Sequence, residues 1–376
     1  MLVGVPKEIK NHEYRVGLTP AAVKEFVAHG NSVLVETNAG ASIGFSDDMY
    51  INAGADIASS AEDVFAKAEM IVKVKEPQPN ECKMLSEGQT LYTYLHLAPD
   101  PTQTQLLVES GATCIAYETV TDPRGGLPLL APMSEVAGRM SIQAGAHFLE
   151  KAHGGSGTLL GGVPGVAPGK VLVIGGGVVG TNAAKMAVGL GADVTILDRS
   201  LSRLRELDDI FGNQLKTVYS TVDAIEHYSS KADLVVGAVL VPGAAAPKLL
   251  NTQHIADMKQ GSVIVDVAID QGGCFETSKA TTHQDPVYVV DGVVHYCVAN
   301  MPGGVARTST MALNNATLPF GLALANKGPK RAMLENPHLL NGLNIHKGKV
   351  TYAAVMEALG EQLSLEFQEA GSALQN

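Results

Sequence analysis

The sequence predicts an α/β protein with two doubly wound domains, each built on a mostly parallel sheet. The chain has 376 residues, more than a single hydrophobic core usually serves. Short apolar runs alternate with helical patterns, which is typical of a parallel sheet covered by helices. Glycine is frequent, at 40 residues, as expected where many tight turns join strands to helices.

The first third of the chain predicts a regular succession of strands and helices. Thr19 can cap a helix in which Pro20 takes the first position, and this helix should end near Gly30. Two further helices are expected over 60–68 and 101–109. The expected strands span 2–5, 32–35, 70–74, 90–94 and 112–116.

The middle and the end of the chain define the second domain and a return to the first. A helical pattern over 134–151 is rich in small residues and connects the domains, and a second series of strands and helices occupies about 170–300. From Ser309 the pattern is helical, and it ends in an amphipathic stretch over 352–367. This tail is too small to form a domain alone, so we expect it to pack on the first domain. The predicted domains are 1–130 with 308–376, and 131–307.

Charge and composition argue against several classes of function. The formal net charge is -11, from 27 basic and 38 acidic residues without basic clusters, which disfavours nucleic acids and anionic membranes as partners. The apolar run that starts at Val171 is interrupted by glycines and is too short to span a bilayer. The first residues lack a charged segment followed by a long apolar stretch, so we expect no signal peptide.

Cysteines and histidines predict no metal site. The four cysteines form no CxxC pair and lack metal-ligand spacing, so we expect free, buried thiols in a cytoplasmic protein. No HExxH motif is present. His147 and His153 are six residues apart, which does not place them on one helical face.

The segment 170–198 carries the strongest motif. A buried strand over 171–174 is followed by G-x-G-x-x-G, a helix over 181–190 and a second strand over 194–197. Gly175 permits a tight turn, Gly177 lets the backbone approach a pyrophosphate, and Gly180 allows close packing of helix on strand. A glycine turn without a ligand is the alternative, but the flanking elements favour a Rossmann dinucleotide-binding domain.

The end of the second strand predicts which dinucleotide is bound. Asp198 follows Gly180 by 18 positions, where a carboxylate accepts hydrogen bonds from the ribose hydroxyls of NAD and repels the 2′-phosphate of NADP. Arg199 and Arg203 follow and could soften this preference. We therefore expect NAD as the cofactor.

Reactive side chains follow several predicted strands. In open parallel sheets ligands bind beyond the carboxyl ends of the strands, and there the sequence places Arg15, Lys75, His96, Asp270 and Asn300. Taken singly, the arginine and lysine could be surface charges, the histidine a structural group and the aspartate a turn cap. Together they place charged groups from both domains where a nicotinamide would project.

The chemistry of these groups suits hydride transfer next to a carboxylate. Arginine grips a carboxylate with two parallel hydrogen bonds. Lysine in a partly dry cleft can polarise a carbonyl or accept a proton. Histidine exchanges protons near neutral pH.

Longer motifs resemble those of the bacterial L-alanine dehydrogenases. They are GVPKEIKNHEYRVGLTP at 4–20, KVKEP at 73–77, YLHLAPD at 94–100, APMSEVAGR at 131–139, GGGVVG at 175–180 and VANMPGGVARTST at 298–310. The resemblance covers nearly the whole chain and is more specific than the glycine motif.

This resemblance implies reversible conversion of L-alanine, NAD and water to pyruvate, ammonium and NADH, usually in a hexamer. It implies catalytic roles for His96, Asp270 and Lys75, and substrate binding by Arg15, Lys75, His96 and Asn300. The implied NAD site contains Ser134, Gly175, Gly177, Val178, Val179, Gly180, Asp198, Arg203, Ser220, Val239, Leu240, Val267, Ala268, Ile269, Asp270, Val298 and Met301.

Three other functions remain open at this point. The NAD-binding component of transhydrogenase shares the fold and much of the opening motif, but that family has no histidine at the position of His96. A 2-hydroxy-acid dehydrogenase would not need Arg15, Lys75 and His96 in this order. A catalytically silent NAD sensor would not need His96 or Asp270.

Overall fold

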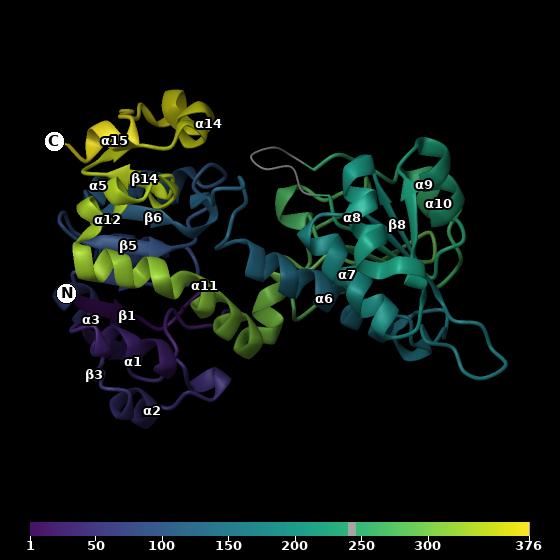
Figure 1. Cartoon of the computed structure of the whole chain (residues 1–376), viewed down its shortest axis with the longest axis horizontal. Helices are drawn as coiled ribbons and strands as arrows, with labels where there is room; N and C mark the ends of the chain where they lie inside the picture. The colour runs from purple at the N-terminus through teal and green to yellow at the C-terminus, as the bar shows by residue number, and fades with distance from the viewer. Residues whose placement is uncertain (240–245, 376) are drawn as a thin grey trace. The chain divides into compact units, whose positions relative to one another are not determined.

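The computed structural model describes residues 1–239 and 246–375, which form two compact units. One unit combines Met1–Met133 with Val305–Asn376, and the other is Ser134–Gly304. Each unit has its own sheet with helices packed on it, so the predicted α/β class is confirmed (Figure 1). No helix in the described part of the chain is both long and apolar enough to cross a membrane.

The first unit is built on an eight-stranded sheet with the order β15-β14-β6-β5-β4-β1-β2-β3. The six strands from the start of the chain pair in parallel, and β14 adds antiparallel to β6. The strands are β1 (Leu2–Val5), β2 (Ser32–Glu36), β3 (Asp56–Ala58), β4 (Met70–Val72), β5 (Thr90–Thr93), β6 (Thr113–Ala116), β14 (Leu343–His346) and β15 (Lys349–Val350).

The helices of this unit begin where the sequence supplies caps. The Thr19 side chain accepts a hydrogen bond from the Ala22 amide at 3.1 Å, and Pro20 opens α1 as expected. The helices are α1 (Pro20–Ala28), α2 (Asp47–Asn52), α3 (Ala61–Lys67), α4 (Pro79–Cys82), α5 (Pro101–Ser110), α11 (Ala306–Lys327), α12 (Pro329–Glu335), α13 (Pro337–Leu340), α14 (Ala353–Leu363) and α15 (Ala370–Ala373).

Helix α11 joins the end of the chain to its beginning. The Asn314 side chain accepts from the Thr19 amide at 2.7 Å and donates to the Gly17 carbonyl at 2.8 Å. These bonds satisfy backbone groups in the loop after β1, which carries Arg15. The C-terminal tail, expected to be helical, also supplies the hairpin of β14 and β15 to the sheet edge.

The second unit is built on a seven-stranded sheet with the order β12-β13-β11-β10-β7-β8-β9. Six strands are parallel and follow the doubly wound order 3-2-1-4-5-6 that dinucleotide-binding domains use, while β12 pairs antiparallel with β13. The strands are β7 (Lys170–Ile174), β8 (Asp193–Asp198), β9 (Lys216–Tyr219), β10 (Leu234–Gly237), β11 (Val263–Asp266), β12 (Val287–Val290) and β13 (Val293–Tyr296).

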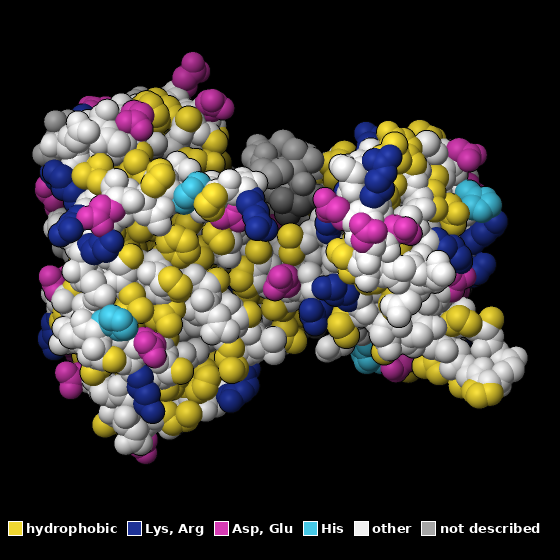
Figure 2. Space-filling view, viewed as in Figure 1, with side chains coloured by type: hydrophobic (Ala, Val, Ile, Leu, Met, Phe, Trp, Pro, Cys, Tyr) yellow, Lys and Arg dark blue, Asp and Glu magenta, His cyan; other side chains and the backbone are white. Residues whose placement is uncertain are grey.

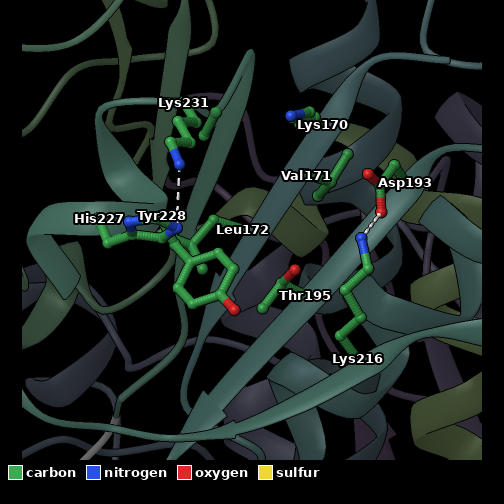
Figure 3. A pocket seen from close by; sticks show the side chains of 10 residues that line it. Lys170, Val171, Leu172, Asp193, Thr195, Lys216, His227, Tyr228 and Lys231 are labelled. Atoms are coloured by element: carbon green, nitrogen blue, oxygen red, sulfur yellow. Dashed lines mark hydrogen bonds and ion pairs between the residues drawn. The ribbon is translucent and has the colours of Figure 1, made fainter. Parts of the chain in front are cut away.

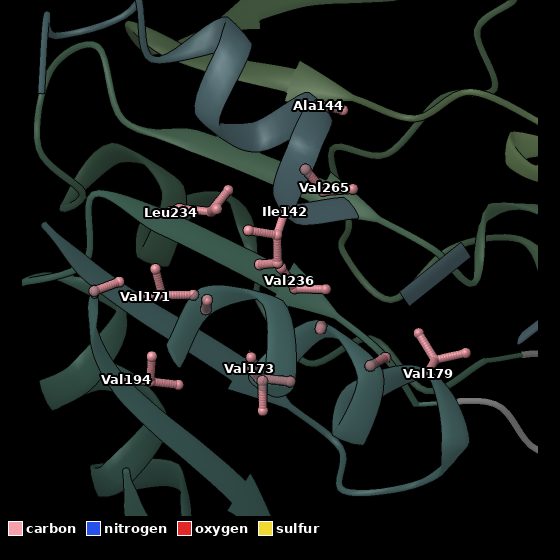
Figure 4. Close-up of a cluster of buried hydrophobic side chains, with 14 of the residues drawn as sticks. Ile142, Ala144, Val171, Val173, Val179, Val194, Leu234, Val236 and Val265 are labelled. Carbon is pink, nitrogen blue, oxygen red and sulfur yellow. The ribbon is translucent and has the colours of Figure 1, made fainter. Parts of the chain in front are cut away.

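One apolar core of the second unit lies between the sheet and helices α6 (Ala131–Phe148) and α7 (Val178–Gly189), and a second one includes Ile174, Ile225 and Ile255. Figure 4 shows part of it, with Ile142 of α6, Val179 of α7 and Val236 of β10 in one apolar cluster. Gly138 and Gly145 permit this packing, because a Cβ atom at either would collide with Val179 or with Leu234. The remaining helices are α8 (Leu201–Phe211), α9 (Val222–Ser229) and α10 (Thr252–Ala256).

Charged side chains of both signs are mixed on the molecular surface. On the face that Figure 2 shows, Lys and Arg side chains are interspersed with Asp and Glu.

Candidate functional site

The glycine loop lies at the position where the strand order of the second sheet reverses, between β7 and β10. Gly175 has φ +105°, and a Cβ atom there would lie 2.7 Å from the Ala238 carbonyl oxygen. A Cβ atom at Gly180 would overlap the carbonyl oxygen of Gly175. The absence of a side chain at these two glycines therefore lets the loop pack closely against its own backbone and against Ala238, which follows β10.

Gly177 differs from the other two glycines. It is the N-cap of α7, with ordinary φ (−68°), and no atom of residues 1–239 or 246–375 lies within 4 Å of the position that its Cβ atom would occupy. Within the described part of the chain no side chain caps α7, so the first amides of this helix can bind an anion, and the helix dipole favours negative charge there. This opening fits the pyrophosphate of a dinucleotide.

Asp198 and Arg203 bind the amide and the carbonyl of one residue in the glycine loop, Gly176. The carboxylate of Asp198 accepts from the Gly176 amide at 2.7 Å, and Nε of Arg203 donates to the Gly176 carbonyl at 2.7 Å. Arg203 also donates to the Thr181 hydroxyl at 2.8 Å and pairs with Glu206. Each carboxylate oxygen of Asp198 can still accept another hydrogen bond, so the residue fits a ribose hydroxyl.

The other predicted cofactor residues lie mainly at the carboxyl edge of the same sheet. The Ser220 amide donates to the Asp198 carbonyl at 2.9 Å, and Val239 follows β10. Leu240 lies outside the described residues. Three of these residues follow β11: Val267, Ala268 and Ile269. Two buried residues, Val298 and Met301, follow β13. Ser134 is half-buried in α6, and α7 begins with Val178 and Val179.

A buried aspartate that sequence analysis did not identify shapes the loop after β11. Asp266 accepts from the Ser278 hydroxyl at 2.5 Å and from the amides of Ala268 and Cys274. Burial raises the pKa of Asp266 despite these bonds. The loop that Asp266 holds presents Asp270 as an exposed side chain.

Arg15 is a buried group, which excludes the surface-charge alternative. Its side chain is 2% exposed, and its Nε and Nη2 donate to the two carboxylate oxygens of Glu13 at 2.7 and 2.6 Å. Burial opposes the charge, but Glu13 outweighs it and raises the pKa of Arg15. Nη1 faces the sulfur of Met133 at 3.2 Å, and a thioether is a weak acceptor that a carboxylate can displace.

A buried ion triad holds the loop that carries Lys75. Nζ of Lys73 lies 3.0 Å from Glu8 and 2.8 Å from Glu81, and all three side chains are nearly inaccessible. The other oxygen of Glu8 accepts from the amides of Val74 and Lys75 at 2.7 and 3.3 Å. The Lys75 side chain remains 15% exposed, with its ammonium 3.8 Å from Glu76.

His96 has a strained backbone and an accessible ring. It has φ +49°, and its amide donates to Glu118 at 2.6 Å. The ring is stacked on Tyr94, with 5.8 Å between centroids, and Nδ1 lies 3.9 Å from Glu118. The side chain is 45% exposed, so it is accessible for proton transfer.

Glu118 was missed, although the strand-end rule could have found it. It follows β6, the neighbour of β5, and accepts from the amides of both Leu95 and His96. Glu118 therefore fixes the backbone from which the His96 ring projects. Sequence analysis also missed Glu13, whose role is evident only from its pairing with Arg15.

The predicted substrate residues are divided between the units. Arg15, Lys75 and His96 belong to the first, whereas Asp270 and Asn300 belong to the second. Asn300 has a left-handed backbone, with φ +58°, and its carbonyl accepts from His283 at 3.0 Å.

A separate cavity lies at the other edge of the second sheet (Figure 3). Its lining includes Lys170 and Asp193, which begin β7 and β8, together with Lys216 and Lys231. Lys216 pairs with Asp193 at 2.5 Å. Because nucleotides bind at the carboxyl edge of such sheets, this cavity is not the dinucleotide site.

The spacing argument against a histidine pair was wrong. Helix α6 ends at Phe148, and the chain turns so that the rings of His147 and His153 approach to 4.0 Å between centroids. Glu150 lies between them, and the three residues form a group that could hold a metal ion.

Comparison with known proteins extends these observations over the whole chain. The models for the N-terminal and C-terminal domains of alanine dehydrogenase/PNT match residues 4–137 and 141–353. The alanine dehydrogenase of Halomonas elongata is 63% identical over 372 residues, which are 99% of each chain. A solved structure described as L-alanine dehydrogenase is 52% identical, with a TM-score of 0.94 over 96% of this chain and 99% of the other.

A second solved structure shows that the fold is shared more widely. A transhydrogenase from Sinorhizobium meliloti has a TM-score of 0.80 at 24% identity, over 94% of this chain and 100% of the other. At that identity the likeness concerns the fold alone. The matches to both domain models and the 63% identity over the full length show that the chain belongs to the alanine dehydrogenase/PNT family.

Proposed function

We propose that this protein catalyses the reversible, NAD-dependent oxidative deamination of L-alanine to pyruvate and ammonium. The observation that carries the proposal is the 63% identity, over 99% of both chains, to a protein named alanine dehydrogenase. The glycine loop with Asp198 supports NAD as the cofactor, and the charged groups at the strand ends of the first unit support an amino-acid substrate.

In this proposal the first unit binds the substrate. Nη1 of Arg15 would receive the substrate carboxylate, while Glu13 fixes the plane of the guanidinium. Lys75 would hold the oxygen that develops at Cα, on a backbone that Glu8 keeps in place. The family resemblance assigns substrate binding to Asn300 and catalysis to Asp270, and both residues belong to the second unit.

His96 would perform the proton transfers. NAD, held by the glycine loop and Asp198, would supply the acceptor for the hydride on Cα of alanine, and the substrate would become an imine. His96 then takes a proton from water as the oxygen adds to the imine carbon, and returns it as ammonia departs. Glu118 would stabilise the imidazolium in between, and Asp270 would act as the second catalytic group.

The cofactor preference, assembly and location are part of the same proposal. We infer NAD rather than NADP from the charge of Asp198, a hexamer from the family resemblance, and a cytoplasmic location from the four buried free cysteines. Sedimentation velocity on the purified protein tests the hexamer, which a monomer or dimer would contradict.

The test of function is the absorbance of NADH after addition of pyruvate, with and without ammonium. Oxidation that requires ammonium supports the proposal, and parallel assays with NADPH test the role of Asp198. Equal oxidation without ammonium would instead identify a 2-hydroxy-acid dehydrogenase. No oxidation, with NADH binding confirmed, would refute catalysis of this reaction.

A further inference from the structure

Two histidines and a glutamate gather where α6 ends, away from the glycine loop. His147 lies in the last turn of α6, Glu150 follows it, and His153 ends the short 3-10 helix Lys151–His153. Nδ1 of His147 and Nδ1 of His153 lie 3.7 and 3.6 Å from the two oxygens of Glu150. One ligand atom from each residue lies within 4.8 Å of the other two.

The fold preorganises this group. The amides of Glu150, His153 and Gly155 donate to carbonyls within the same turn. Gly154 has φ +88°, and a Cβ atom at Gly155 would overlap the backbone of Leu149, so the turn needs both glycines.

An aromatic contact also positions the two imidazoles. Both rings pack edge-on against Phe148, with centroid distances of 5.0 and 5.7 Å, and Phe148 itself is buried against Tyr296. Each histidine ring therefore contacts a buried aromatic residue on one side, although both rings remain partly exposed.

The distances fit a small divalent cation. With metal–nitrogen and metal–oxygen bonds of about 2.0–2.2 Å, two ligands of a tetrahedral site lie about 3.3–3.6 Å apart. The observed separations of 3.7 and 3.6 Å, each to a different oxygen of Glu150, are close to this range, and all three ligand atoms lie within 4.8 Å of one another. Nδ1 of His153 would exchange its 3.3 Å contact with the His147 carbonyl for the metal.

Ligand chemistry and exposure narrow the class of cation. Neutral imidazoles and a carboxylate favour Zn²⁺, Ni²⁺, Co²⁺ or Cu²⁺ over Mg²⁺ and Ca²⁺, which take oxygen ligands. The side chains of His147, Glu150 and His153 are 52, 61 and 35% exposed, so water can fill the remaining positions.

We propose that His147, Glu150 and His153 form a surface site for a divalent transition-metal ion, with Zn²⁺ as the reference ligand. The ion would fasten the end of α6 to the turn that leads toward β7. Because the ion binds the folded state, it would raise the melting temperature of the protein in proportion to the logarithm of its concentration. The site is independent of the proposed dehydrogenase activity.

The test uses the full-length protein without a polyhistidine tag, stripped of metals with a chelator. Zn²⁺ is titrated in competition with a fluorescent zinc indicator, and the melting temperature is measured in the same samples. We expect one Zn²⁺ per chain. His147→Ala and His153→Ala should each weaken binding by more than about tenfold, since losing even a group that orients a metal ligand costs about 10–100-fold in affinity.

His29→Ala is the matched control, because His29 is an exposed histidine in the other unit. It should leave both Zn²⁺ binding and the thermal shift unchanged. The proposal would be overturned if the wild type and the His147→Ala/His153→Ala double variant bind Zn²⁺ with equal affinity. Binding that survives in the double variant and disappears after thiol alkylation would also overturn it, because the ion would then be held by cysteines.

Discussion

Two alanine substitutions in the glycine loop separate cofactor binding from folding. In Gly180→Ala the new Cβ atom would lie 2.9 Å from the carbonyl carbon of Gly175 and overlap its oxygen. Such overpacking costs about 1–3 kcal/mol. At about 2–4 °C per kcal/mol, we expect the melting temperature to fall by about 2–12 °C.

Gly177→Ala should have the opposite pattern. Alanine fits at this position, because φ is −68° and no described atom lies near the Cβ position. Alanine caps a helix less well than glycine, but it also lowers the entropy of the unfolded chain, and these two effects offset each other. We expect the free energy of unfolding to stay within about 0.5 kcal/mol of the wild type. The methyl group would nevertheless occupy the approach of the pyrophosphate, and a cost of about 1–3 kcal/mol corresponds to NADH binding about 5- to 150-fold weaker.

Both variants are compared by thermal unfolding without cofactor and by titration of NADH fluorescence. The reasoning fails if Gly177→Ala lowers the melting temperature as much as Gly180→Ala does, because the space at Gly177 would then not be open. It fails equally if Gly177→Ala binds NADH with wild-type affinity, because the pyrophosphate would then not approach this residue.

Four further substitutions test the proposed roles of single residues. His96→Asn, chosen because asparagine tolerates the left-handed backbone, should lower kcat about 10²–10⁴-fold with NADH binding kept, and near-normal kcat would refute acid–base catalysis. Asp198→Asn should lower the ratio of kcat/KM for NAD to that for NADP, and an unchanged ratio would contradict the assigned role. Arg15→Lys should raise KM for pyruvate, because a point charge cannot replace the planar fork; an unaltered KM would remove Arg15 from the substrate site. Lys73→Met leaves two buried carboxylates without their cation and should destabilise the protein in urea by about 3–5 kcal/mol. Burial raises the pKa of Glu8, so this carboxyl gains a proton as the pH falls; the loss of stability should shrink at lower pH, and a loss independent of pH would contradict this account.

The fold class and most strands could be predicted because long apolar runs and glycine turns are local signals. The strand expected over 70–74 is Met70–Val72, and the one over 112–116 is Thr113–Ala116. The helix expected over 134–151 is Ala131–Phe148, and Pro132 in its first turn was the missed signal. Short strands at and next to the sheet edges escaped prediction: β3 has three residues, and β14 carries polar Asn344 and pairs with a strand far away in the sequence.

Single residues were harder to assign, because burial depends on partners that the fold brings together. Arginines are mostly exposed, yet Arg15 is buried because Glu13 pairs with it. Likewise, Lys73 is buried because Glu8 and Glu81 approach it from other elements. The spacing of His147 and His153 was misjudged because helical periodicity applies only while the helix continues.

Glu118 shows how far the strand-end rule extends. The rule states that side chains after parallel strands gather at one edge of the sheet, so it applies to every strand, including one whose following residues look unremarkable. Glu118 follows β6 and contacts His96, which follows the adjacent β5, and it bonds the amides of both Leu95 and His96. The carboxylate thus holds the strained backbone of His96 and lies near its ring. Glu118→Gln keeps the acceptor for the amides while removing the charge near the imidazole, so its effect on kcat separates the backbone bonds of Glu118 from its charge.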